Sequence, residues 1–155
     1  MRTGLALLFM GAMAVTLSAT VHPAVDIPAL AKGAEKVVVA SVQQVDARFD
    51  TNEFGDKLIV SDAALRVEET LKGAHTASAT VTVEGGTVGN LTLDVSDMPV
   101  LKAGDRAVVF LRRTAAGNTV PQGRGVGIMK LDGNNRIEDS DLTLDDVRQA
   151  VRANR

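Results

Sequence analysis

Histidine, the side chain most often used in catalytic and zinc sites, occurs at only two positions of this sequence. His22 lies near two prolines, and His75 ends the turn-like stretch Lys72–His75. A catalytic triad or a zinc site needs histidine together with acidic or thiol partners at defined spacing, and neither histidine has them. The chain has no cysteine and no serine in a Gly-x-Ser-x-Gly motif. The sequence therefore predicts neither a nucleophilic catalytic site nor a zinc site.

Carboxylates are the remaining catalytic candidates, because two of them are sufficient for glycoside hydrolysis. Glu68 and Glu69 are adjacent on an expected strand, so they point to opposite faces and cannot act together. Asp94 and Asp97 flank an expected turn, where aspartate more often serves solubility. We therefore expect a protein that is not an enzyme, with a carboxylate-only hydrolase that uses Glu68 or Asp94 as the enzymatic alternative.

A cluster of aspartates near the C-terminus raises the possibility of calcium binding. It lacks the glycine of an EF-hand loop, and the twelfth position counted from Asp139 is Ala150 instead of glutamate. Two of its members are explained by the capping of a helix. We expect no metal site here. The cluster consists of Asp139, Asp141, Asp145 and Asp146.

Glycines gather at residues 85–89 and 123–127, which raises the question of a phosphate-binding loop. Neither stretch fits the Walker A motif or the dinucleotide fingerprint, and neither precedes an expected helix, so we expect no cofactor. The formal net charge is −2, and the chain has no Trp and no Tyr. Nucleic acid is therefore excluded as an expected partner, because basic patches and aromatic stacking are missing.

The first residues follow the order of a secretory signal peptide. Met1–Gly4 is short and positively charged, Leu5–Leu17 is an uncharged apolar run, and Ser18–Ala19 supplies small residues for cleavage. The apolar run is shorter than the roughly 20 residues that cross a bilayer. We expect residues 1–19 to be removed after Ala19, which leaves a periplasmic or secreted protein with no stable membrane anchor. The alternatives are a buried helix or a retained anchor.

Residues 20–34 are interpreted as a flexible lead-in, and residues 35–139 as one β-domain. In the first strand the apolar residues occupy even positions up to Val42 and odd positions from Val45. This switch of parity predicts a β-bulge at Gln43–Gln44, which bends a long strand.

Further period-two segments complete the expected domain. Residues 107–111 are apolar at every position, which predicts a strand buried on both faces. A last strand pair is expected around Gly125 and Gly127. The interior should contain aliphatic side chains and three large rings, Phe49, Phe54 and Phe110. The other expected strands are residues 58–71, 78–84 and 91–95.

Residues 140–155 change to a helical period. Thr143 and Asp146 have the spacing of a capping box, with aspartate in the role usually taken by glutamate. Leu144, Val147 and Val151 lie on one face of the expected helix. We predict a short amphipathic C-terminal helix that packs across the barrel.

Together these patterns predict an all-β fold: a small five- to seven-stranded OB-like barrel with a short C-terminal helix, preceded by a signal peptide helix. The order of the segments, with VEETLKG at Val67–Gly73 and GDRAVVFL at Gly104–Leu111, resembles uncharacterised exported bacterial β-barrel proteins of OB-like layout. These proteins are distantly similar to netrin-like and tissue-inhibitor-of-metalloproteinase-like domains. The resemblance covers roughly Glu35–Leu131 and implies a barrel. The inhibitors chelate the protease metal through an amino-terminal cysteine, which this chain lacks, so their mechanism is not carried over.

The function expected from export, barrel patterning and missing catalytic groups is binding. We predict a non-enzymatic exported domain whose loops or edge strand contact another exported protein. The alternative is a barrel that binds a small molecule or a glycan, which for an apolar ligand would require an unfilled interior.

Overall fold

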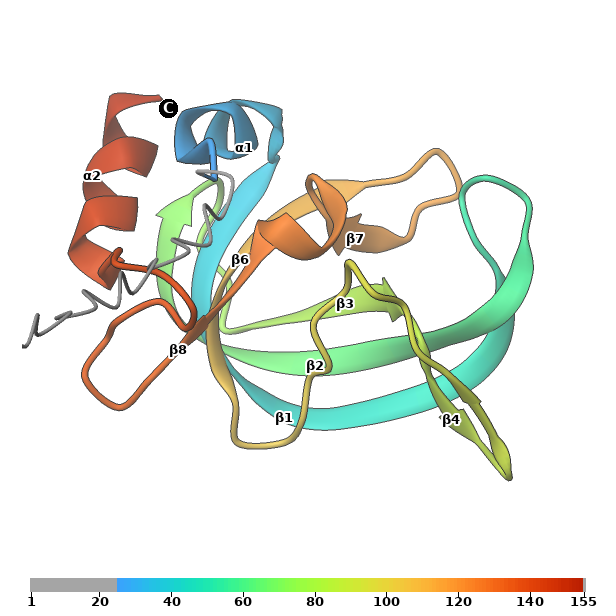
Figure 1. The fold of residues 1–155 in the computed structure, drawn as a ribbon. Helices are drawn as coiled ribbons and strands as arrows, with labels where there is room; N and C mark the ends of the chain where they lie inside the picture. The colour runs from blue at the N-terminus through green and yellow to red at the C-terminus, as the bar shows by residue number, and fades with distance from the viewer. Residues whose placement is uncertain (1–24, 155) are drawn as a thin grey trace, which may run out of the picture.

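The computed structural model describes residues 25–154, which fold into one six-stranded antiparallel sheet, a separate two-stranded hairpin and two α-helices (Figure 1). The strand order in the large sheet is β3-β2-β1-β6-β7, and β8 pairs with β6. The expectation of a mostly β fold with a C-terminal helix is confirmed. The elements are α1 (Ile27–Gly33), β1 (Lys36–Thr51), β2 (Lys57–Lys72), β3 (Ser78–Glu84), β4 (Gly86–Val88), β5 (Leu91–Leu93), β6 (Arg106–Arg113), β7 (Thr119–Pro121), the 3₁₀-helix η1 (Arg124–Gly127), β8 (Ile128–Leu131) and α2 (Leu144–Ala153).

The long strands β1 and β2 give the sheet its curl. Their pairing shifts register between Val42 and Gln44, so the bulge predicted from the parity switch is confirmed. Before the bulge β1 pairs with both β2 and β6, and beyond it β1 pairs with β2 alone. The bend carries the loop between β1 and β2 round toward the β6–β7 hairpin (Figure 1).

Two hydrophobic cores lie on opposite faces of β1 and β6. Val38 and Val109 belong to the inner core, inside the curl of the sheet, whereas Val37 and Phe110 belong to the helix-side core beneath α1 and α2. Successive residues of a strand point to opposite faces, so a strand covered on both sides must be apolar throughout. This arrangement explains the uninterrupted apolar run of β6 and confirms that β6 is buried on both faces.

The helix α1 occupies Ile27–Gly33, within residues 20–34 for which a flexible lead-in is predicted, and residues 20–24 of that range lie outside the described residues. The carboxylate of Asp26 caps its first turn, accepting a hydrogen bond from the Ala29 backbone N–H at 2.9 Å. The ammonium group of Lys72 donates to the carbonyl oxygens of Ala31 and Ala34, at 2.6 and 2.8 Å, at the other end. A seven-residue helix is marginal alone, so these contacts and its packing beside α2 hold it. Its buried side chains are Ile27, Leu30 and Ala31.

The C-terminal helix forms as predicted, although it spans Leu144–Ala153 and not all of residues 140–155. Thr143 accepts from the backbone N–H of Asp146, and the Asp146 carboxylate accepts from the backbone N–H of Thr143. The capping box is therefore confirmed with aspartate in the third position. Leu144, Val147 and Val151 are buried against the sheet and α1.

The sheet does not close into the predicted barrel. β3 and β7 lie near each other, but no ladder of backbone hydrogen bonds joins them. The physical reason is that β7 pairs with β6 over only three residues, after which the chain leaves the sheet and enters η1. Pro121 also has no N–H to donate. We call the gap between β3 and β7 the seam.

Two of the three rings expected in the interior lie on the surface. Phe110 is fully buried, but Phe49 and Phe54 are 61% and 67% exposed. Phe49 lies beyond the bulge, on the part of β1 that pairs with β2 alone, and Phe54 lies in the loop between β1 and β2. The expected strand pair around Gly125 and Gly127 is also wrong, because this stretch forms η1 before β8 begins.

The predicted signal peptide over residues 1–19, its cleavage after Ala19, and His22 lie outside the described residues. Within residues 25–154, neither helix has the length and apolar character needed to cross a bilayer.

Candidate functional site

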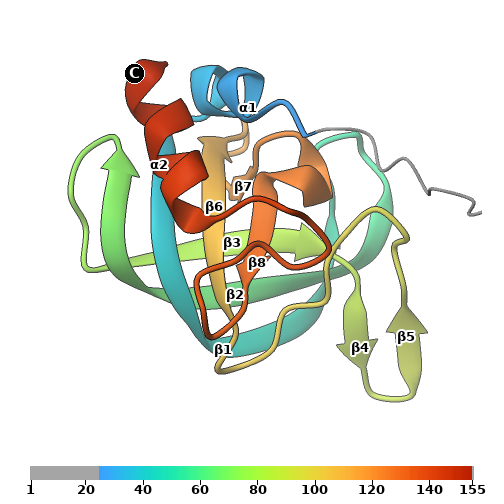
Figure 2. The ribbon, with the colours of Figure 1, turned by 60° about the vertical axis from the view of Figure 1, so that its left-hand side comes forward.

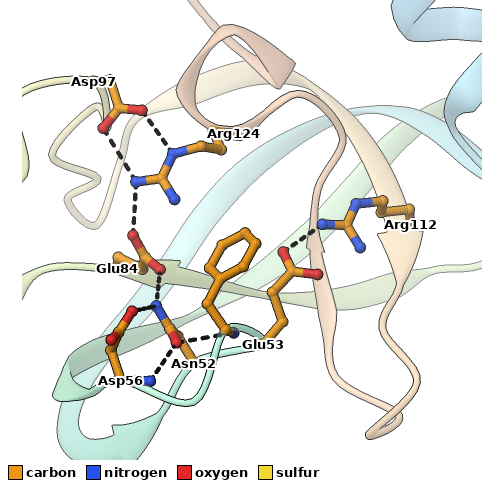
Figure 3. Close-up of polar contacts among 8 residues, drawn as sticks. Asn52, Glu53, Asp56, Glu84, Asp97, Arg112 and Arg124 are labelled. Atoms are coloured by element: carbon orange, nitrogen blue, oxygen red, sulfur yellow. Dashed lines mark hydrogen bonds and ion pairs between the residues drawn. The ribbon is translucent and has the colours of Figure 1, made fainter.

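A chain of polar contacts spans the seam at one end of the sheet (Figure 3). The guanidinium of Arg124, on η1, donates to the Glu84 carboxylate at 2.7 Å and to the Asp97 carboxylate at 2.6 Å. The other oxygen of Glu84 accepts from the side-chain amide of Asn52 at 2.8 Å. These contacts join η1, the end of β3, the segment after β5 and the β1–β2 loop. We call Asn52, Glu84, Asp97 and Arg124 the seam network.

An ion pair fixes the same loop from the other side of the seam. Glu53, the residue after Asn52, pairs with Arg112 on β6 (Figure 3). Because the sheet curls, residues far apart in sequence meet here: Glu53 and Arg112 are separated by 59 positions. Side chains thus make the connection across the seam that backbone pairing does not make.

The charges of the seam network reinforce one another. The hydrogen bonds that Arg124 donates to Asp97, and secondly to Glu84, raise the pKa of Arg124 above its ordinary value. The same contact with Arg124 lowers the pKa of Asp97 below its ordinary value of 3.8. Both groups are therefore charged at neutral pH, and neither is poised to exchange a proton there. The arrangement is suited to clamping surface elements together.

A small pocket of about 80 Å³ lies between the β1–β2 loop, β3 and the β6–β7 hairpin. Its polar side includes Asn52, Glu84 and Arg124, and its apolar side includes Val83 and Val120. Pockets that enclose drug-sized ligands have volumes of roughly 300–1,000 Å³. The pocket is therefore much smaller than an enclosed site for such a ligand.

An open groove of about 640 Å³ lies beside the β1–β2 hairpin. Phe49, Leu58 and Ile59 contribute its apolar lining from β1 and β2, and Leu93 contributes from β5. The β4–β5 hairpin projects from the body of the domain next to this hairpin (Figure 2). We call this feature the hairpin groove. It combines an exposed aromatic ring with aliphatic side chains on a surface open to solvent.

The glutamates weighed as a catalytic pair bind different arginines. Glu68 pairs with Arg106 on β6 at 2.9 Å, whereas Glu69 pairs with Arg148 on α2 at 2.6 Å. The structure therefore separates the two carboxylates, as their positions on a strand predict. Each carboxylate holds a neighbouring element in place.

The other sequence candidates are scattered. His75 is exposed, with its Nδ1 3.5 Å from the Thr70 hydroxyl. Asp94 is exposed on the segment after β5, and only Asp97 of that pair joins the seam network. Among the C-terminal aspartates, Asp145 pairs with Arg148 and Asp146 serves the capping box. Within residues 25–154, no three His, Asp or Glu side chains converge as a metal site would require.

The members of the seam network carried no recognisable sequence signal as a group. Arg124 is 40 residues from Glu84 and 27 from Asp97, so no local spacing relates them. Asn52 alone had a local signature, because Asn in a polar loop before Gly55 is typical of an Asx turn.

Comparisons with known proteins add no identification. No protein-family model matches the chain, and no curated protein matches it.

The seam network predicts a fall in stability at acid pH. Because Arg124 lowers the pKa of Asp97, the contribution of this carboxylate is present above its ordinary pKa of 3.8 and is lost as the pH falls through the folded-state pKa. We expect the urea midpoint to fall between about pH 5 and pH 3. Asp97→Asn should lower the midpoint at pH 7 and flatten this fall.

Asp94→Asn provides the matched control, since Asp94 is an exposed aspartate in the same segment with no ion pair among the described residues. In Asp94→Asn the urea midpoint should depend on pH as it does in wild type. Superimposable profiles for wild type and Asp97→Asn would contradict the assignment of Asp97 to the seam network.

Proposed function

We propose that the chain is an exported, non-enzymatic β-domain that binds another exported protein, and that the β1–β2 hairpin and its loop form the binding surface. The observation that carries this proposal is the exposure of Phe49 and Phe54 on a single hairpin, in a chain with no Trp and no Tyr. Large aromatic side chains are the usual anchors of protein interfaces. Here the described part of the chain exposes two of its three.

The hairpin groove supports the same surface. Phe49 and Leu93 line it from two hairpins, and Leu91 at the start of β5 is 55% exposed. A monomeric domain gains nothing in stability from leaving such side chains in water, because each square ångström of apolar surface that stays exposed forgoes about 25 cal/mol of burial. A partner that covers the groove would recover that free energy.

The proposal includes export because residues 1–19 resemble a leader. It also includes an OB-like layout, as an open and curled sheet, because of the strand order. Binding of an apolar small molecule inside the domain has less support, because the inner core is filled by aliphatic side chains and the small pocket beside the seam network holds only about 80 Å³. A loop surface is the better supported binding element.

The test is cross-linking in the native envelope and culture fluid, followed by recovery of the tagged protein under denaturing conditions. Wild type should yield a cross-linked exported protein, and Phe49→Asp should lose it. His75→Asp places the same charge on an exposed turn far along the chain and should retain it. Failure to recover any exported protein with wild type, or recovery that Phe49→Asp leaves unchanged, would count against the proposal.

A further inference from the structure

Phe54 lies in the loop between β1 and β2, and 67% of its surface is exposed. It is the most exposed of the large apolar residues in the part of the chain that the structure describes. Loop tips usually carry small polar residues. With two thirds of its surface in solvent, the ring contributes little to the packing of the domain itself.

The backbone that carries Phe54 is held by a dense set of hydrogen bonds. The side-chain oxygen of Asn52 accepts from the backbone N–H of Phe54 at 3.0 Å and from that of Asp56 at 2.9 Å. The backbone N–H of Asn52 donates to the carbonyl of Asp56 at 2.9 Å, and Gly55 supplies the positive φ of 91° that the turn requires. The loop therefore presents the ring from a defined backbone conformation.

Contacts with the rest of the domain fix the loop as a whole. Asn52 donates to Glu84 on β3 at 2.8 Å, and Glu53 pairs with Arg112 on β6 (Figure 3). The residues on the N-terminal side of Phe54 are thus tied to two different strands. A loop ordered before binding loses little conformational entropy on binding, so its contacts contribute more fully to affinity.

The charges of the loop indicate the chemistry of what it meets. Residues 50–56 carry Asp50, Glu53 and Asp56 and no basic side chain. Asp50 and Glu53 already have arginine partners, whereas Asp56 is exposed and forms no ion pair among the described residues. A partner arginine or lysine could pair with Asp56, and an arginine could also stack on the face of Phe54.

We propose that the loop Asn52–Asp56 is a preorganised anchor, in which Phe54 enters an apolar pocket of the partner protein and Asp56 pairs with a basic residue on the rim of that pocket. This inference rests on the proposed function and adds the residue that inserts and the charge of the surface that receives it. The exposure of Phe54 makes its ring available to a partner, and the hydrogen bonds of Asn52 hold the loop in one conformation. The acidic side chains of the loop favour a partner whose pocket has a basic rim.

The test uses a displayed library of random peptides, selected on the immobilised full domain. The peptides recovered should combine apolar residues with Arg or Lys. Synthesised and titrated in solution, they should bind Phe54→Ala at least tenfold more weakly than wild type, which is a loss of about 1.4 kcal/mol or more. Asp56→Lys should weaken binding more at low salt than at high salt.

Val100→Ala is the matched control, because Val100 is 64% exposed and lies on a different loop. It should bind the peptides as wild type does. All variants should keep the wild-type urea midpoint, since these side chains are exposed, and this shows that any loss of binding is not a loss of folding. Peptides that bind Phe54→Ala as tightly as wild type, peptides rich in acidic residues, or a library that yields no binder would overturn the inference.

The cross-linking and peptide-binding experiments together distinguish a failure of this inference from a failure of the proposed function. If envelope cross-linking recovers an exported protein that depends on Phe49 while Phe54→Ala changes nothing, the domain binds through the hairpin groove and the anchor is wrong. If neither experiment yields a partner or a peptide, both proposals fail.

Discussion

Phe110→Ala is expected to destabilise the domain by about 3–5 kcal/mol, the range found when a buried phenylalanine is truncated in a packed core. Phe110 is fully buried on β6 and belongs to the helix-side core with Val37, Val147 and Val151. It is the only ring in that core among residues 25–154, so no neighbouring aromatic of the described part can fill the space left behind. A domain of this size has a total stability of roughly 5–15 kcal/mol, so the loss is a large part of the whole.

The measurement is urea unfolding followed by far-ultraviolet circular dichroism, with Phe49→Ala as the matched control. Phe49 undergoes the same truncation at 61% exposure, and we expect a change within about 0.5 kcal/mol. If Phe110→Ala does not fold, Phe110→Leu keeps most of the volume and should cost less. Equal effects of truncation at Phe110 and Phe49 would contradict the assignment of Phe110 to the core.

The parts of the fold that follow from local patterns could be predicted. The bulge at Gln43–Gln44 was visible as a change of parity, and the double burial of β6 was visible as an uninterrupted apolar run. The capping box at Thr143 and Asp146 depends on a spacing of three residues. Each of these signals is contained in one segment, so no knowledge of distant partners is needed.

The parts that depend on distant contacts could not be predicted. The helix α1 is short and contains Pro28, and its stability comes from Lys72 and from the packing of α2. Phe49 continues the apolar parity of its strand, yet it lies where β1 pairs with β2 alone, and 61% of it stays exposed. Only the path of the whole chain decides these outcomes.

The same reasoning applies to the candidate site. The expected barrel required β3 and the last strands to pair, but the chain turns into η1 after only three paired residues of β7. Closure across the seam therefore depends on side chains, and Arg124 reaches partners that lie 27 and 40 positions away. The candidate site exists because the sheet stays open. A prediction of a closed barrel therefore did not include it.

Gly125→Ala is the second substitution with a large expected effect. It tests how η1 packs against the segment that carries Asp97 at the seam. A Cβ at this position would overlap the backbone carbonyl oxygen of Asp97 and approach the Cα of Met98 to 3.1 Å. Both obstacles are backbone atoms, so no side-chain rotation can relieve them. We expect a loss of about 3 kcal/mol, at the upper end for overpacking, because either η1 or the segment that carries Asp97 has to move.

Gly133→Ala is the control, since no atom lies within 4 Å of its added Cβ and its φ is not positive. It should leave the urea midpoint unchanged or raise it slightly. The displacement caused by Gly125→Ala also separates Arg124 from Asp97, so Asp97→Asn should cost less in that background than in wild type. Additive effects of the two substitutions would mean that the seating of η1 does not position Arg124, and the account of the seam network would then be wrong.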